Sequence, residues 1–150
     1  MRLITRWIFS LSLVGPVVPL SPSVAQTPSP EERVVQEALT AIDYCFHWAG
    51  EGGDQSEERN KEINEGLNQD CPVAKAKAQQ AYQLYPQNAA LAAGLLALID
   101  IDYFDVTEAE KTRLCQTAAP RFRGAFRTSQ TEDVLFRSTC PAQAATVYGH

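Results

Sequence analysis

The spacing of apolar residues after position 30 is helical. Between residues 31 and 49, apolar side chains recur every three or four positions and so share one helix face: Val35, Ala38, Leu39, Ile42, Cys45, Phe46 and Ala49. Ser29, Pro30 and Glu32 form a start signal, with a capping side chain, a proline at the first helical position and an acid three residues after the cap. Gly50 stands where a left-handed C-terminal cap is expected. The pattern predicts an amphipathic first helix that ends at Gly50.

The next stretch predicts two shorter helices that meet at a proline. Asp54 or Ser56 can cap the first of them, which has few apolar residues on one face: Ile63, Leu67 and Cys71. We therefore expect this helix to lie on the surface. Pro72 ends it and begins an alanine-rich helix over residues 72–85. These alanines resemble the second half of a tetratricopeptide unit, whose first half has no counterpart upstream, so a repeat-like hairpin is an alternative.

The most apolar segment of the mature chain follows. Asn88 can cap a helix over residues 89–104, which is apolar nearly all round and therefore belongs in the centre of a bundle. Thr107 and Glu110 form a capping box for the next helix. No stretch alternates apolar and polar residues for long enough to predict a strand.

The helical signal is less regular near the C-terminus. Residues 121–127 read RFRGAFR and predict a short helix that pairs Phe122 with Phe126, and Thr131 can cap a last helix. The segment after residue 140 is small and polar, and we place no helix in it. Together the segments predict an all-α protein, a small bundle of about five to six short helices.

The first 25 residues have the three parts of a secretory signal peptide: arginines, an apolar run over residues 7–20, and small residues at 23–25. Cleavage is expected after Ala25, so the mature chain is expected in the periplasm or outside the cell. The apolar run of about 14 residues is shorter than the roughly 20 that span a bilayer. We therefore expect no stable membrane insertion after the signal is cleaved.

The mature chain has the size of one domain and an uneven charge. Residues 26–30 are rich in proline and predict a disordered lead, and residues 31–150 predict a single helical domain. Residues 31–70 hold eleven acidic and three basic side chains, whereas residues 111–137 hold six basic and two acidic ones. The acidic excess disfavours nucleic acid as a partner, because phosphates require basic side chains. The uneven distribution of charge could steer a charged partner toward the protein, or the acidic and basic faces could simply be solvated.

The cysteines are four in number and all lie in the mature chain: Cys45, Cys71, Cys115 and Cys140. An even count in an exported chain predicts two disulfides. Of three pairings we favour Cys45 with Cys71 and Cys115 with Cys140, because neighbouring cysteines at the ends of consecutive short helices come easily within bridging distance. A zinc site is disfavoured, since the chain has no C-x-x-C pair.

Residues 45–54 read CFHWAGEGGD and gather the most chemically distinctive side chains. His47 and Glu51 are four residues apart, so on a continuous helix they could hold a metal ion or share a proton. A break is expected at Gly50, so this spacing need not keep them together, and the only other histidine is the last residue. We therefore favour a structural role here, with Trp48 in the core or covering the disulfide.

This segment resembles a pattern in small exported bacterial proteins of uncharacterised function. The resemblance rests on Cys45, His47, Trp48, Gly50, Glu51, Arg59, Ile63 and Cys71, with Arg59 one place further along than in that pattern. It implies a disulfide-bridged helical hairpin, supports the Cys45–Cys71 pairing, and implies an ion pair between Glu51 and Arg59. The resemblance does not imply any activity.

The basic stretch near the C-terminus is the second candidate interaction site. Arg121, Arg123 and Arg127 alternate with Phe122 and Phe126, a pattern that could bind phosphate or single-stranded nucleic acid by charge and stacking. In an acidic, exported chain we favour pairing with the acidic first half of the same fold, and next an acidic surface of a partner protein.

The sequence lacks the usual catalytic motifs. There is no G-x-S-x-G and no H-E-x-x-H, and cysteines held in disulfides cannot act as nucleophiles. We therefore expect no catalytic residues, no metal site and no cofactor. The leading hypothesis is an exported, non-enzymatic helical protein that binds another, unidentified protein. An inhibitor or immunity-type protein is the narrower form, by analogy of fold. The alternative is a metal-binding or hydrolytic protein that uses His47 and Glu51.

Overall fold

The computed structural model describes residues 28–51, 56–123 and 130–149 of the chain. In chain order these residues form six helices: α1 (Pro30–Gly50), α2 (Glu57–Leu84), α3 (Ala89–Asp100), α4 (Glu108–Arg123), α5 (Gln130–Thr139) and α6 (Pro141–Tyr148). No strand occurs in these three ranges, so the predicted all-α class is confirmed. The predicted signal peptide lies outside them, as do Asp54, Phe126 and Arg127.

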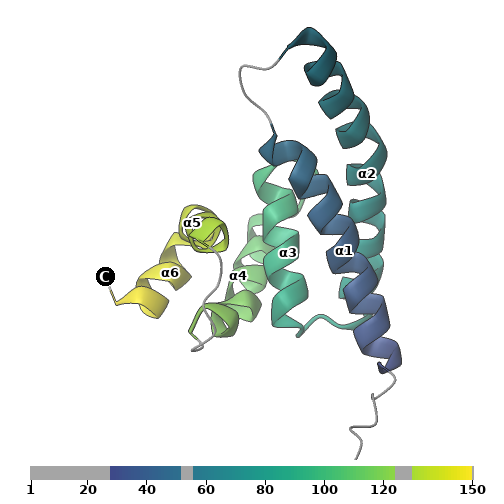
Figure 1. Ribbon diagram of the computed structural model, residues 1–150. Coiled ribbons are helices and arrows are strands. Elements are labelled where there is room, and N and C mark those ends of the chain that lie inside the picture. Colours follow the sequence, from purple (N-terminus) through teal and green to yellow (C-terminus); the bar gives the residue numbers. More distant parts are fainter. Residues whose placement is uncertain (1–27, 52–55, 124–129, 150) are drawn as a thin grey trace, which may run out of the picture.

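The helices pack around α3. Helices α1 and α2 form a long hairpin along one side of the molecule, α4 lies beside α3, and α5 and α6 lie on the opposite side (Figure 1). Helix α3 contacts α1, α2, α4 and α5. Its leucines are fully buried: Leu91, Leu95, Leu96 and Leu98. The central position predicted for this segment is therefore confirmed.

No helix within the described ranges is long and apolar enough to cross a membrane.

Both predicted disulfides are present. Cys45 of α1 is bonded to Cys71 of α2, and Cys115 of α4 is bonded to Cys140, the residue between α5 and α6. All four cysteines are buried. The first bridge joins the two helices of the hairpin, and the second joins the helices of the C-terminal half.

Helix α2 is one continuous element, so the prediction of two helices meeting at Pro72 is wrong. Proline in a helix interior removes one hydrogen bond, at a cost of about 3 kcal/mol. The apolar stripe nevertheless continues through the proline at helical spacing: Ile63, Cys71, Ala74, Ala78 and Ala81 are all buried. Asn68, whose carbonyl loses its donor, is exposed, so water can satisfy it. Burial of the stripe and the disulfide at Cys71 outweigh the local cost.

The ends of α1 and α3 also differ from expectation. The start signal of α1 is confirmed, because Ser29 and Glu32 form the reciprocal capping box. The helix ends at Gly50 as predicted, but Gly50 is its last helical residue and the cap is Glu51 in a right-handed conformation, so the left-handed cap expected at Gly50 is wrong. Helix α3 begins after the cap Asn88 as predicted but stops at Asp100, because Asp102 adopts a left-handed conformation with φ 64° and turns the chain.

The C-terminal half is more helical than predicted. Helix α4 runs through Pro120, because Ala118, Ala119 and Phe122 continue its buried face. Helix α5 begins at Gln130, so Thr131 lies inside it and is not its cap.

Residues 141–148 form α6, where no helix was expected. Arg137 lies over the ring of Tyr148, and the Tyr148 hydroxyl donates a hydrogen bond to Asp133 at 2.9 Å. Together with the adjacent Cys140 disulfide, these contacts hold a segment whose apolar residues are mostly small alanines.

Candidate functional site

Trp48 joins the end of α1 to the middle of α2. Its indole ring lies against Gly66, where a Cβ atom would overlap the ring. Its Nε1–H donates a hydrogen bond to Oδ2 of Asp70 at 2.7 Å. The ring is partly buried between the two helices and is not part of the buried core, so the core position that we considered for Trp48 is wrong. Trp48 also fixes the position of the Asp70 carboxylate.

His47, Glu51 and Arg59 form a small polar cluster beside the tryptophan. Because α1 includes Gly50 and Glu51 is its cap, His47 Nε2 lies 3.5 Å from Glu51 Oε1, so the end of the helix does not keep these two residues apart. Glu51 also accepts a hydrogen bond from Arg59 of α2, so the ion pair implied by the sequence resemblance is present. Arg59 reaches Glu62 at 2.6 Å as well, and its guanidinium lies 5.8 Å from the centre of the Trp48 ring.

The ion pair changes the acidity of both partners. The hydrogen bond from Arg59, helped by its positive charge, holds the pKa of Glu51 below the usual 4.5, although partial burial opposes this effect. The same contacts raise the pKa of Arg59. Since the pKa of Glu51 is lower in the folded chain than in the unfolded one, the pair stabilises the fold above pH 4.5. This stabilisation is lost as the pH falls through the folded pKa.

Replacing Arg59 by glutamine is expected to raise the pKa of Glu51 toward 4.5, because the main hydrogen-bond donor and charge are removed. An NMR titration of the Glu51 carboxyl group would measure this shift. Lys61→Gln is the matched control, since Lys61 faces Glu65 at 3.8 Å and not Glu51. An unchanged Glu51 pKa in Arg59→Gln would contradict the assignment.

The same cluster is poorly suited to hold a metal ion. The His47 side chain is 62 % exposed, and the guanidinium of Arg59 is already paired with Oε2 of Glu51, so its positive charge would repel a cation held between His47 and Oε1. Within the described ranges, no three residues of the His, Cys, Asp and Glu types are grouped as metal ligands. The chemistry that these residues offer is ion pairing across the hairpin.

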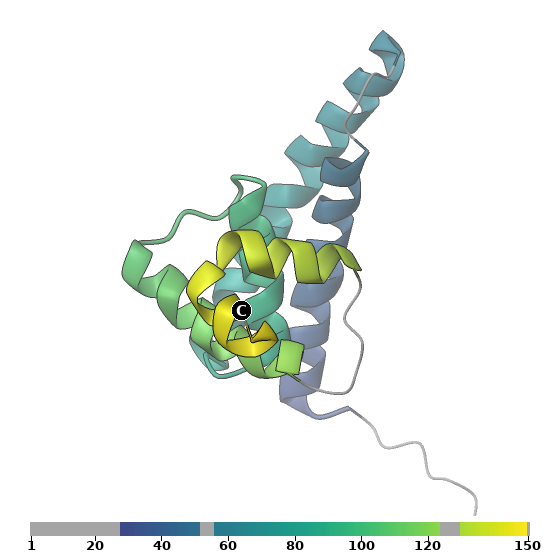
Figure 2. The same ribbon diagram turned by 90° about the vertical axis from the view of Figure 1, so that its left-hand side faces the viewer.

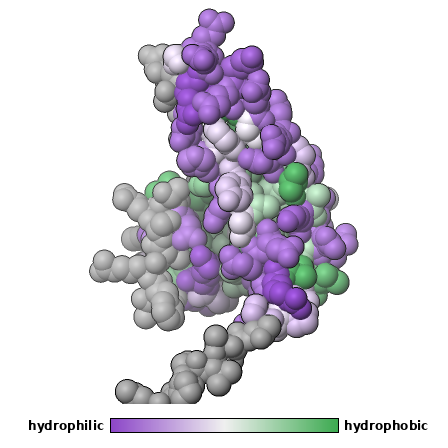
Figure 3. Space-filling model, turned by 45° about the vertical axis from the view of Figure 1, so that its right-hand side comes forward, coloured by the Kyte–Doolittle hydropathy of each residue, from purple (hydrophilic) through white to green (hydrophobic). Residues whose placement is uncertain are grey.

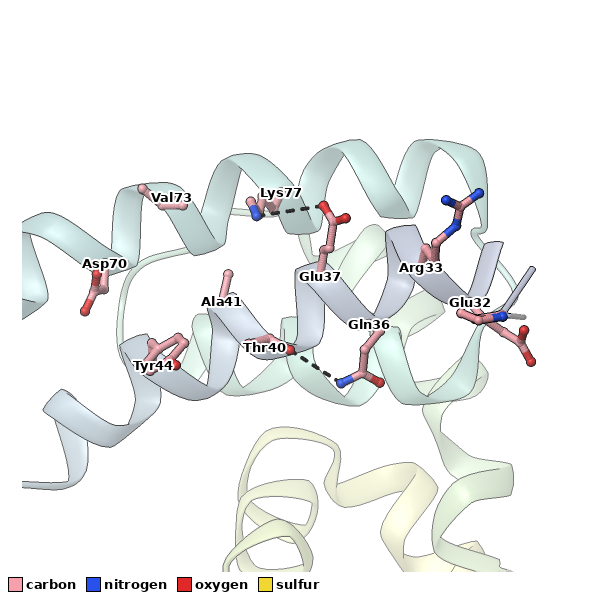
Figure 4. A pocket seen from close by; sticks show the side chains of 11 residues that line it. Glu32, Arg33, Gln36, Glu37, Thr40, Ala41, Tyr44, Asp70, Val73 and Lys77 are labelled. Carbon is pink, nitrogen blue, oxygen red and sulfur yellow. Dashed lines mark hydrogen bonds and ion pairs between the residues drawn. The ribbon is translucent and has the colours of Figure 1, made fainter. Parts of the chain in front are cut away.

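A groove runs along the outer face of the α1–α2 hairpin, the face turned away from α3. Its volume is about 440 Å³. At one end, Tyr44 of α1 and Val73 of α2 stand on either side, with Ala41 between them (Figure 4). Tyr44 and Val73 are 62 % and 49 % exposed, so the groove offers apolar surface to the solvent.

Charged residues border this outer groove. Asp70, which Trp48 holds by its hydrogen bond, lies next to the Tyr44 and Val73 end (Figure 4). Further along, Glu37 and Lys77 form an ion pair of 3.9 Å between the two helices. The projecting end of the hairpin is almost entirely hydrophilic, whereas apolar patches interrupt the hydrophilic surface nearer the body of the molecule (Figure 3). The outer groove therefore combines an apolar end with two carboxylates, Asp70 and Glu37, that neighbouring side chains hold in place.

Of the C-terminal arginines, the structure describes Arg121 and Arg123. Arg121 pairs with Glu132 of α5 at 2.9 Å, so its partner is within the C-terminal half and not in the acidic first half that we expected. Arg123 is exposed, and Arg127 lies outside the described residues. Phe122 stacks on Phe136, with ring centres 4.1 Å apart, and so belongs to the core. Phe122 therefore offers no surface on which a nucleic-acid base could stack.

Sequence reasoning missed Tyr44, Val73 and Asp70 as site residues. One signal was available, because Tyr44 falls outside the apolar stripe of α1 and Val73 outside the alanine stripe of α2. Large apolar residues on the polar face of an amphipathic helix indicate a surface used for contact when they gather together. The sequence alone does not show that Tyr44 and Val73 come together, because they lie 29 positions apart.

Comparisons of the chain with protein-family models, with curated proteins and with solved structures found no match. The function therefore has to be argued from the site itself.

Proposed function

We propose that this chain is an exported helical protein whose work is to bind another protein, and that it does so through the outer groove of the α1–α2 hairpin. The observation that carries this proposal is the pairing of Tyr44 with Val73. Large hydrophobic residues exposed in the described part of the chain are Tyr44, Val73, Leu84 and Val134. Two of these four flank one groove.

The chemistry of the groove supports protein binding better than catalysis. Tyrosine supplies a large contact area with few rotatable bonds and is enriched where partner proteins bind. The nearest titratable groups are already engaged, Asp70 with Trp48 and Glu37 with Lys77. An inhibitor or immunity-type protein is the narrower form of this function, in which the outer groove would cover part of an enzyme.

Serine substitutions at Tyr44 and Val73 test the proposal. We expect the double variant to lose roughly tenfold or more of its affinity for the protein partner, because the exposed apolar contact at one end of the groove is removed. The measurement is quantitative capture of partner from periplasmic extract by the immobilised, disulfide-bonded chain. Both positions are exposed, so the fold should be unaffected.

The matched control carries serine at Leu84 and Val134, which are equally exposed but lie away from the outer groove. This control should capture the same partner in the same amount as the unmodified chain. Equal losses in both double variants, or no loss in either, would contradict a role of the outer groove in binding.

A further inference from the structure

We infer that the occupant of the outer groove is a basic amphipathic α-helix of a partner protein. This inference rests on the proposed function and names the chemistry of the partner. The partner helix places an apolar side chain between Tyr44 and Val73, and an arginine or lysine against the carboxylate of Asp70.

The shape of the hairpin favours a helix as the occupant. Two adjacent antiparallel helices present a groove on each of their two faces. On the inner face α3 contacts both α1 and α2 (Figure 2). On the outer face the groove extends along α1 from Glu32 to Tyr44, about 18 Å at 1.5 Å per residue, which is the length of about three helical turns. The small side chain of Ala41 lets another helix approach closely, as in other helix-in-groove complexes.

The charge of the surface favours a basic partner. Asp70 is held by a single hydrogen bond from Trp48 to Oδ2, and a carboxylate can accept several more. A guanidinium group matches such a carboxylate with two parallel hydrogen bonds. The lining of the outer groove holds three acids, Glu32, Glu37 and Asp70, against two bases, Arg33 and Lys77, and Lys77 is paired with Glu37. Residues 31–70 as a whole hold eleven acids against three bases, so the field of this half of the chain attracts a positive segment. A second copy of this chain would instead bring one acidic hairpin against another.

The probe is a synthetic 14-residue helical peptide with leucines at positions i, i+4 and i+7 and arginines beside them. Its counterpart has glutamate at every arginine. We expect the arginine peptide to bind the disulfide-bonded chain, measured by fluorescence anisotropy, and the glutamate peptide not to bind. Asp70→Asn should weaken binding about fivefold or more, although asparagine keeps an oxygen that can accept the Trp48 hydrogen bond.

The matched control is Glu58→Gln, which removes the same charge from an exposed position in the first turn of α2. We expect it to change binding less than twofold. If Asp70→Asn and Glu58→Gln weaken binding equally, the peptide is attracted only by the overall negative charge of the chain, and the inference is overturned. Binding of the glutamate peptide would also overturn it. Trp48→Phe keeps an aromatic ring but frees Asp70, and it should weaken the arginine peptide in the same direction as Asp70→Asn.

Failure of this inference can be told apart from failure of the proposed function. If the Tyr44 and Val73 double variant loses the captured partner while Asp70→Asn keeps it, protein binding stands and the basic helix is rejected. If neither variant loses the partner, both proposals are rejected. Concentration-dependent dimers that the Tyr44 and Val73 substitutions dissociate would identify a second copy as the occupant and would overturn the basic-helix inference.

Discussion

Replacement of Cys45 and Cys71 together by alanine is expected to lower the free energy of unfolding by about 3–4 kcal/mol. The bridge closes a loop with a sequence separation of 26 residues, and its loss gives the unfolded chain more conformations. Both cysteines are completely buried. No contact with the solvent at these positions therefore offsets the loss of the bridge. Urea unfolding followed by circular dichroism would measure the change.

The other disulfide provides the matched comparison. Cys115 and Cys140 close a loop of nearly the same size, with a separation of 25 residues, so their replacement by alanine should cost a similar amount. A loss below about 1 kcal/mol in either variant would show that the chain-entropy account does not hold for this protein.

Substitution of alanine for Gly66 is expected to destabilise the fold by about 1–3 kcal/mol, the usual cost of overpacking. Alanine is the better helix former by about 1 kcal/mol, so the helix alone would predict the opposite sign. The new methyl group, however, would overlap the Trp48 ring and disturb its hydrogen bond to Asp70. Thermal or urea unfolding would show directly whether Gly66→Ala lowers or raises the stability of the fold.

Two further variants isolate the cause of the Gly66 effect. Gly50 is also helical, but a Cβ atom added there would meet nothing within 4 Å, so Gly50→Ala should be neutral or stabilising by up to about 1 kcal/mol. In a chain that already carries Trp48→Ala, Gly66→Ala should no longer destabilise. A stabilising Gly66→Ala in the otherwise unmodified chain would exclude close packing of Trp48 on α2.

The local signals in the sequence predicted helix starts better than helix ends. Ser29, Asn88 and Thr107 cap helices as predicted, because a cap is a contact between residues three positions apart. Pro72 was expected to end a helix and does not, and α4 runs through Pro120 into residues that were expected to form a separate short helix. Whether a helix continues past a proline depends on what its next turns can bury, and that depends on helices distant in the sequence.

The same difference between local and distant contacts applies to the site. The pairing of Glu51 with Arg59 was implied by the sequence resemblance, and the two residues lie only eight positions apart. The outer groove could not be predicted, because Tyr44 and Val73 come together only when α1 and α2 lie antiparallel. The hydrogen bond from Trp48 to Asp70 likewise joins residues 22 positions apart.

The two disulfides follow one another along the chain and do not interleave. Each covalent ring closes before the other begins, so the two oxidation steps can occur in either order without threading one ring through the other. A single backbone cut between Cys71 and Cys115 would divide the oxidised chain into two fragments without a covalent link. After a cut inside either ring, the bridge would still hold the fragments together.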